Sequence, residues 1–566
     1  MGLETINNIQ EPCMSDVCRS NRRAELCRLL FLLVLAYPLF FHMAGERYIW
    51  SPDEDEYALV NREMVEDGHW IFPTANGKPY SIKPPFFNWI GSLISLVNGE
   101  VTEATSRLPS AIAATAGIII LYLLGKALFG YRAGFLAALV LATSPLYVNF
   151  ARWIQINMMS TMLLTATLFF FYWGYTDEKR RNLAYLLMYI PTGLGTLNMG
   201  PVNVVMPGIV IALYLFLLKD YRHIFQLRIG RGLLIYLLIV APWYVAVSLR
   251  EGYAYNIFIE TNLTRFFGHF SHAEPIYYYF LTTPLDFLPW TLYLPGAIIA
   301  YFSHVREDEK RKLLFPLIWA AGLFVFFSLS RTKRNEYLLP IFPALALLVG
   351  FVIDRAFLNW RKSAFWRRCV MRPTYPFFAV LIVIGLGLPI YAWLNAPDWI
   401  PVLIPVSLLA VMCVVISAVF LTKDRGYAAI VTVVLFAAGV VAYGSDAVVG
   451  KVNDVKSARS FCLNIEERIP PGEKLKMFQF YRPVYAYYTH RVVEHTEDPA
   501  VLQEWFSSHE RAYIVTKEKV YLKIKEAFPL PIYVIHRQWI DHRYVLLLSN
   551  RPDDRSPEPA RSVHKG

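Results

Sequence analysis

The chain has 566 residues, of which 55% are hydrophobic and only 17% are charged. Soluble domains carry about 25% charged residues and lack repeated apolar runs of ~20 residues, so this composition excludes an ordinary soluble protein. The net charge of +11 does not favour a nucleic-acid partner, because the basic residues cluster in short loops between apolar runs. We therefore predict a polytopic α-helical membrane protein that binds no nucleic acid.

Apolar runs long enough to cross a bilayer, with allowance for tilt, recur about thirteen times along the chain. They lie at residues 27–43, 107–126, 132–150, 157–175, 182–198, 200–218, 231–248, 284–303, 313–329, 335–356, 376–394, 401–421 and 426–447. Every second loop between them is basic, and the positive-inside rule assigns such loops to the cytoplasm. The pattern predicts a cytoplasmic segment at 1–26 and a membrane domain at 27–449. No small-residue cleavage site follows the first run, which we expect to remain as an anchor.

The same rule predicts four segments on the outer side, namely 44–106, 249–283, 330–336 and the chain after about 447. Inside the first of these, residues 55–67 have a helical pattern. Residues 86–97 are apolar but too short to span, which suits a helix lying in the membrane interface. The second segment is rich in aromatic residues, as expected of an interfacial loop.

Residues 450–550 differ from the rest of the chain, because charge rises and short strand patterns alternate with helical ones. The strand patterns lie at 475–481, 512–516, 532–535 and 544–548, and the helical ones at 454–468, 499–508 and 520–527. We predict a small α/β domain outside the membrane, on the periplasmic side. The tail at 551–566 is rich in Pro, Arg and Ser and is predicted to be disordered.

Two charged clusters on the predicted outer side could carry chemistry. Four consecutive carboxylates, Asp53 to Glu56, follow the first span and have no obvious packing role. Arg331, Lys333 and Arg334 crowd a short outer loop against the positive-inside trend. Cations at headgroup depth can hold a phosphate, and a carboxylate can deprotonate an acceptor. The alternatives are a flexible acidic loop for the carboxylates and lipid-headgroup contacts for the cations, Lys83 included.

The first outer segment carries a family resemblance. The pattern Asp53-Glu54-x-x-Tyr57-Ala58, continued by Asn76-Gly77-x-Pro79-Tyr80-x-x-Lys83-Pro84-Pro85, resembles the first outer loop of GT-C integral-membrane glycosyltransferases of the protein-mannosyltransferase and aminoarabinose-transferase type. Weaker matches follow at Ala151-Arg152, Gly200-Pro201, Asp286 to Trp290 and Ser328 to Pro340. The resemblance covers most of residues 30–350, and an outer α/β domain after thirteen spans fits the aminoarabinose-transferase branch.

The resemblance implies a GT-C fold and an enzyme of a bacterial inner membrane. The enzyme would move a sugar from a polyprenyl phosphate to lipid A or another envelope glycan on the periplasmic face, with inversion at the anomeric carbon. It implies Asp53 as the catalytic carboxylate. It implies donor-phosphate contacts from Lys83 and Arg265, with Arg331 and Lys333 as helpers, and substrate contacts from Glu54, Tyr57, Tyr80 and Tyr337.

The sequence departs from the family pattern at several of these positions. Asp55 and Glu56 stand where the family has a small residue and an arginine, Ile82 where it tends to have glutamate, Asn157 where many members have aspartate, and Asn198-Met199 in place of Thr-Lys. No cofactor is certain. The metal hypothesis is zinc or magnesium near Glu260, His269 and His272, and the alternative is that these histidines bind no metal.

Two other functions stay open on the sequence. A protein O-mannosyltransferase would share the loop chemistry but transfer to Ser or Thr. A lipid or sugar transporter without enzymatic activity would need ionisable residues deep inside its spans, and this chain places few there. The sequence specifies neither the sugar, the acceptor, nor the oligomeric state.

Overall fold

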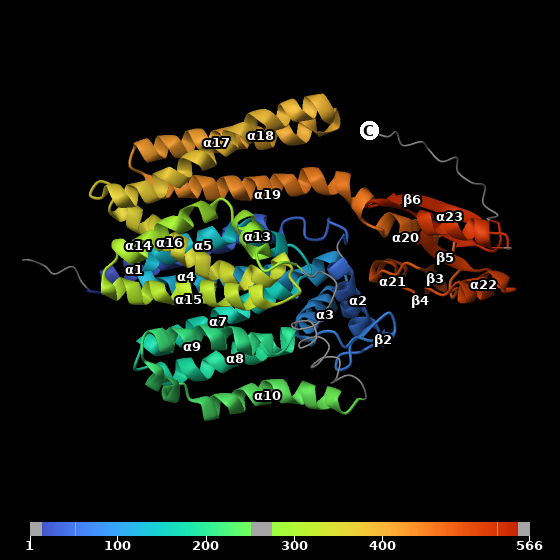
Figure 1. Ribbon diagram of the computed structural model, residues 1–566, viewed down its shortest axis with the longest axis horizontal. Coiled ribbons are helices and arrows are strands. Elements are labelled where there is room, and N and C mark those ends of the chain that lie inside the picture. The colour runs from blue at the N-terminus through green and yellow to red at the C-terminus, as the bar shows by residue number, and fades with distance from the viewer. Residues whose placement is uncertain (1–13, 51, 251–273, 529, 553–566) are drawn as a thin grey trace, which may run out of the picture.

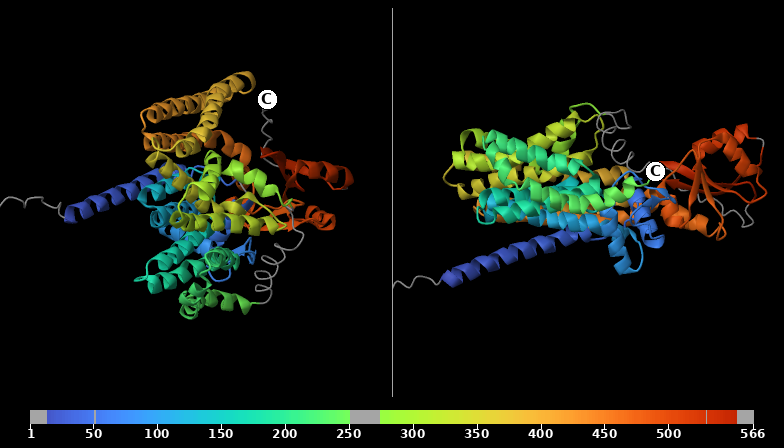
Figure 2. Two further views of the ribbon diagram at one scale, coloured as in Figure 1. Left: turned by 60° about the vertical axis from the view of Figure 1, so that its left-hand side comes forward. Right: turned by 90° about the horizontal axis from the view of Figure 1, so that it is seen from below.

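The computed structural model describes residues 14–50, 52–250, 274–528 and 530–552. A bundle of long helices forms the body of the molecule, and a small α/β domain lies at one end of it (Figure 1). Helix α1 (Met14–Ala36) leaves the bundle at the opposite end, as both views of Figure 2 show. The chain is a multi-pass membrane protein. One end of its helix bundle carries the α/β domain, and α1 leaves the bundle at the other end.

The bundle helices follow the thirteen predicted spans one for one. They are α1 with the π-helical η1 (Tyr37–Phe41), α4 (Glu103–Phe129), α5 (Tyr131–Ala142) with α6 (Pro145–Ala151), α7 (Ile156–Thr176), α8 (Arg181–Met199), α9 (Val202–Leu217), α10 (Ile229–Ser248), α13 (Tyr278–Asp286) with η4 (Trp290–Tyr293) and α14 (Leu294–Ser303), α15 (Glu307–Leu329), η5 (Asn335–Ile341) with α16 (Phe342–Leu358), α17 (Ala364–Asn395), α18 (Ile400–Thr422) and α19 (Gly426–Lys456). Within the described ranges, nine helices are long and apolar enough to cross a membrane, or eleven when each of two bent pairs counts as one span. The other two predicted spans fall on α8, which is more polar, and α9, which has 16 residues.

Glycines let three helices approach closely in the centre of the bundle. A Cβ atom added to Gly134 of α5 would lie 2.5 Å from the backbone N of Lys126 in α4, and one added to Gly350 of α16 would lie 2.7 Å from the backbone N of Ala137 in α5. Membrane helices gain their packing energy from such close backbone contacts, since burial from lipid adds no hydrophobic gain. The core of the bundle therefore depends on small residues at these crossings.

Substituting Gly134 by alanine is expected to destabilise the bundle by about 1–3 kcal/mol, because α4 must move to admit the methyl group. Gly387→Ala is the matched control, since a Cβ there meets no atom within 4 Å. Thermal unfolding of the two variants in the same detergent checks the prediction. Equal midpoints for both variants would contradict it.

The first predicted outer segment forms two helices and a short hairpin at the same end as the α/β domain (Figure 1). Helix α2 (Pro52–Glu66) and helix α3 (Phe86–Asn98) confirm the helical patterns predicted at 55–67 and 86–97. Strands β1 (Thr74–Ala75) and β2 (Lys78–Pro79) pair antiparallel between them. Helix α2 packs against α3 on one side and against the C-terminal domain on the other.

The C-terminal domain is built on a five-stranded sheet with the order β4-β3-β5-β7-β6. Strand β3 (Leu475–Phe478) runs parallel to β4 (Val493–Thr496) and β5 (Tyr513–Lys517), whereas β7 (Arg543–Ser549) runs antiparallel to β5 and to β6 (Tyr533–Ile540). The helices of the domain are α20 (Arg459–Glu466), α21 (Pro483–Thr489), α22 (Pro499–Ser507) and α23 (Glu518–Ala527). Helix α19 leads directly into it (Figure 1). The predicted tail lies, from residue 553 onwards, outside the described residues.

The sequence patterns missed β4 and α21. Strand β4 reads Val-Glu-His-Thr, with one apolar residue, and α21 has only seven residues, so neither shows a clear apolar periodicity. Helix α21 matters for the site, because it packs on α2.

Candidate active site

The first turn of α2 carries Asp53, Glu54 and Asp55, and each binds arginine from a different part of the chain. Successive residues of a helix point about 100° apart, so the three carboxylates diverge around the helix axis. Negative charge in the first turn also suits the helix dipole. These ion pairs fix the N-terminal turn of α2 in place. Glu54 and Asp55 have the packing role that the sequence did not reveal.

Glu54 is fully buried and points into the bundle. Its Oε1 and Oε2 accept from Arg47 Nη2 (2.6 Å) and Nη1 (3.0 Å), and its Oε1 accepts from Arg107 Nε (3.1 Å). Burial alone would raise the pKa of Glu54, but Arg107 and Arg47 outweigh it and lower the pKa to about 2. The geometry gives Glu54 a structural position, away from the described cavity where a substrate contact was expected.

Asp55 is also buried, but it points toward the C-terminal domain. Its Oδ2 accepts from Arg482 Nε (3.2 Å) and Nη2 (3.1 Å). Burial raises the pKa of Asp55 to about 7, and Arg482 offsets this effect only in part. Like Glu54, it is absent from the described lining of the cavity.

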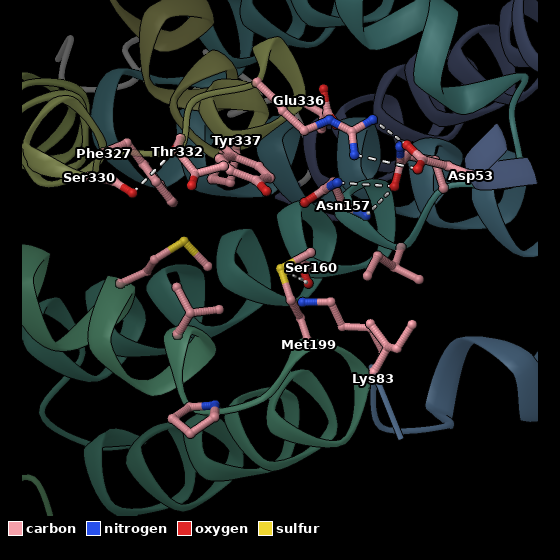
Figure 3. Close-up of a pocket in the computed structure, with 18 of the residues that line it drawn as sticks. Asp53, Lys83, Asn157, Ser160, Met199, Phe327, Ser330, Thr332, Glu336 and Tyr337 are labelled. Atoms are coloured by element: carbon pink, nitrogen blue, oxygen red, sulfur yellow. Dashed lines mark hydrogen bonds and ion pairs between the residues drawn. The ribbon is translucent and has the colours of Figure 1, made fainter. Parts of the chain in front are cut away.

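Asp53 faces a cavity of about 430 Å³ that opens between α2, the N-terminus of α7, α9 and the loop after α15 (Figure 3). One part of the lining is polar and charged, with Asp53, Glu56, Lys83, Arg334 and Glu336. Another part is apolar, with Val202, Val205, Met206, Phe326 and Phe327. A cavity of this kind suits an amphipathic ligand with an anionic head.

Arg334 joins two carboxylates at the polar part of the cavity. Its Nη2 pairs with Asp53 Oδ2, its Nη1 lies 3.4 Å from Asp53 Oδ1, and its Nε lies 2.5 Å from Glu336 Oε1. Burial lowers the pKa of Arg334, but Asp53 and Glu336 outweigh it and raise the pKa above the ordinary value. Arg334 belongs to the charged cluster of the predicted outer loop. The family resemblance, however, implied phosphate contacts from its neighbours Arg331 and Lys333.

Those neighbours take other positions. Lys333 Nζ donates to the backbone carbonyls of Ser330 (2.5 Å) and Glu274 (3.0 Å), and the residue is 4% exposed. Arg331 is absent from the described lining of the cavity, and its backbone carbonyl accepts from the N–H of Glu274. Arg265 lies outside the described residues.

Lys83 does reach the cavity. In Figure 3 it lies across from Asp53, and Asn157 and Ser160 of α7 lie between the two. Because Lys83 follows the hairpin and precedes α3, the rigid Pro84-Pro85 pair fixes the backbone that presents it. The structure thus brings one predicted cation and the predicted catalytic carboxylate to a single cavity.

The three predicted tyrosines divide between the cavity and the core. Tyr57 and Tyr337 line the cavity. Tyr80 is buried, and its backbone N–H donates to Pro73 in the hairpin. Four positions at which the sequence departs from the family pattern also line the cavity: Glu56, Ile82, Asn157 and Met199.

The predicted metal ligands Glu260, His269 and His272 lie outside the described residues. In the described part of the chain, the one group whose side chains lie close enough together to hold a metal ion is Glu63, Asp67 and His69. Glu63 already accepts hydrogen bonds from the Thr74 hydroxyl and the backbone N–H of Asn76, both at 2.6 Å. This group is therefore explained by the hairpin that it holds.

Comparison with known proteins supports the resemblance. A family model described as dolichyl-phosphate-mannose-protein mannosyltransferase matches residues 82–245. An undecaprenyl phosphate-alpha-4-amino-4-deoxy-L-arabinose arabinosyl transferase from Aeromonas salmonicida is 30% identical over 327 residues, which are 57% of this chain and 58% of that protein. The second such transferase of Proteus mirabilis is 29% identical over 332 residues, 58% of each protein. The alignments thus span less than two thirds of these curated relatives.

The crystal structure of ArnT from Cupriavidus metallidurans bound to undecaprenyl phosphate matches with a TM-score of 0.79 and 22% sequence identity, covering 94% of this chain and 99% of that chain. This match establishes the fold over 94% of the chain. The chain therefore has the GT-C fold of ArnT, and the resemblance to the protein-mannosyltransferase and aminoarabinose-transferase group is confirmed.

Proposed function

We propose that the protein is a glycosyltransferase that moves a sugar from a polyprenyl phosphate to an envelope acceptor. The observation that supports the proposal is the cavity, which is lined by Asp53, Lys83 and Arg334 and has an apolar wall beside them. The apolar wall suits the prenyl chain, and the two cations suit the phosphate. Relatives that carry arabinosyl-transferase names, and the relative bound to undecaprenyl phosphate, support the same donor class.

The geometry supports a single displacement. Asp53 takes the proton of the acceptor hydroxyl or amine, whose oxygen or nitrogen then attacks the anomeric carbon of the donor. The bond from that carbon to the phosphate oxygen breaks with its electron pair, and Lys83 and Arg334 stabilise the phosphate as it leaves. Arg334 also holds the carboxylate of Asp53 in place through its ion pair before the acceptor binds. Inversion at the anomeric carbon follows from this order of events.

We place the cavity at the outer, periplasmic side of a bacterial inner membrane, with the N-terminus in the cytoplasm. Two observations support this orientation. The basic loops alternate along the chain in the pattern of the positive-inside rule. The cavity helix α2 and the C-terminal domain lie at one end of the bundle, and α1 leaves at the other (Figure 1).

Lipid A or another envelope glycolipid is the acceptor class that the resemblance to aminoarabinose transferases implies. The second candidate is a protein O-mannosyltransferase, which the family model over residues 82–245 favours. A transporter fits less well, because it would need ionisable residues deep inside its spans. The charged residues in the described lining of the cavity lie instead on α2, just before α3 and between α15 and α16.

Transfer by the purified full-length protein tests the proposal. The donors are a pool of undecaprenyl-phosphate sugars, and the acceptors are lipid A-type glycolipids or Ser/Thr peptides in separate reactions. We expect label in the lipid product with release of undecaprenyl phosphate. Label in peptide alone would establish the second candidate, and no transfer from any donor would overturn both.

Lys83→Ala is expected to weaken undecaprenyl-phosphate binding by about 10- to 100-fold, since a hydrogen bond to a charged group contributes about 1.5–3 kcal/mol. Lys78→Ala is the matched control, because Lys78 is an exposed lysine of the adjoining strand β2. Binding of a labelled undecaprenyl phosphate to protein in nanodiscs measures the effect. Equal affinities for both variants would remove Lys83 from the phosphate site.

A further inference from the structure

Asp55 and Arg482 form an ion pair between the helix that carries Asp53 and the C-terminal domain. The side chain of Asp55 is 0% exposed and that of Arg482 is 18% exposed. Both guanidinium contacts, at 3.2 Å and 3.1 Å, go to one carboxylate oxygen, Oδ2. Neither residue belongs to the described lining of the cavity, so the pair acts on catalysis through another group.

The geometry points to Asp53 as that group. Asp55 follows it by two residues and points about 200° around the helix from it. Arg334 and Arg482 therefore hold the first turn of α2 from nearly opposite directions. A carboxylate lies several Å from the helix axis, so a rotation of ~20° about that axis would move Asp53 by about 2 Å. A misplacement of ~1 Å already slows a reaction on the order of 10²-fold.

We propose that Arg482 is a positioning residue which, through Asp55, fixes the orientation of Asp53 and so couples the C-terminal domain to the cavity. This inference rests on the proposed function, since it assigns a role in the same transfer. Docking of the domain on α2 has separate contacts, such as the hydrogen bond from Arg62 to the backbone carbonyl of Ala486 at 2.7 Å. Arg62 lies nine residues beyond Asp53, whereas Asp55 shares its helical turn.

The titration of Asp55 supplies a readout that a purely structural contact would not give. Its pKa, raised to about 7 by burial, is offset in part by Arg482 and raised further by the charge of Glu56. The domain also faces it with Tyr481 and Tyr485, whose pKa values burial raises so that both stay neutral near pH 7. As the pH falls through about 7, Asp55 gains a proton and its attraction to Arg482 weakens. The kcat of the wild type is therefore expected to fall over this range.

Steady-state transfer by full-length Arg482→Gln, Asp55→Asn and the double variant tests the proposal. Each single variant is expected to lower kcat at pH 7.5 by about tenfold or more, while KM for the donor changes by less than about threefold, because the cavity contacts remain. The double variant is expected to be no slower than the slower single variant, because the two residues act as one unit. Asp55→Asn is also expected to lose the decline of kcat below pH 7.

Two further variants separate positioning from folding. Arg537→Gln removes the 2.8 Å ion pair with Glu518 inside the C-terminal domain and should leave kcat at the wild-type value. If Arg482→Gln fails to fold, Arg482→Lys is used instead, because it keeps the positive charge. Its kcat should lie between the wild-type value and the value expected for Arg482→Gln. Wild-type kcat in the folded single variants, losses confined to KM, or losses that multiply in the double variant would each overturn the proposal. A wild-type protein that transfers no sugar refutes the proposed function itself, which is a distinct result.

Discussion

Replacing Asp53 by asparagine is expected to lower kcat for sugar transfer by about 10²- to 10⁴-fold, the range in which general-base catalysis contributes. The amide keeps the shape of the side chain but cannot take the proton of the acceptor. Donor binding is expected to persist, because Lys83 and the apolar wall of the cavity are unchanged. Transfer rates and labelled-donor binding, measured on the same preparation, check both parts of the expectation.

Asp67→Asn is the matched control for that variant, since Asp67 follows α2 directly and is exposed. It should transfer at the wild-type rate. Full activity of Asp53→Asn would contradict the assignment of the base. The remaining carboxylate of α2 that lines the cavity is Glu56, because Glu54 and Asp55 are turned away and buried.

Glu54→Gln is expected to have the largest effect on stability, lowering the free energy of unfolding by about 3–5 kcal/mol. The neutral amide leaves Arg47 and Arg107 as buried cations without their shared carboxylate. Because the pKa of Glu54 is lowered from 4.5 to about 2 in the fold, its stabilisation is fully present above about pH 4.5 and is lost as the pH falls toward 2.

Unfolding midpoints of Glu54→Gln and Glu66→Gln in one detergent measure this effect. Glu66 lies on the same helix, is 49% exposed and pairs with Arg62 at 3.5 Å, so its loss should change stability by less than about 1 kcal/mol. Similar midpoints for the two variants would show that Glu54 does not hold the helix. A large drop for Glu54→Gln alone would confirm the structural assignment.

The membrane architecture could be predicted from the sequence because it depends on local properties. Apolar runs and alternating basic loops are read directly along the chain, and each of the thirteen predicted spans meets a helix. The helical patterns in the first predicted outer segment were equally local. Periodicity gave no signal in α21, which has seven residues, or in β4, which has one apolar residue.

The partners of the α2 carboxylates could not be predicted, because they are distant in the sequence. Arg107, Arg334 and Arg482 lie 53, 281 and 427 residues from Glu54, Asp53 and Asp55 respectively. Adjacent carboxylates look alike in a sequence, yet a helix turns them toward a bundle, a cavity and a separate domain. That divergence is why Asp53 reaches the cavity and why Glu54, which the motif includes, does not.

A structure of the wild-type protein with undecaprenyl phosphate bound tests most directly whether Asp53 faces the donor. We predict the phosphate within hydrogen-bond distance of Lys83 Nζ and the Arg334 guanidinium, with the prenyl chain against Val202, Val205 and Phe327. A phosphate held elsewhere, with this cavity empty, would show that Asp53 does not face the donor.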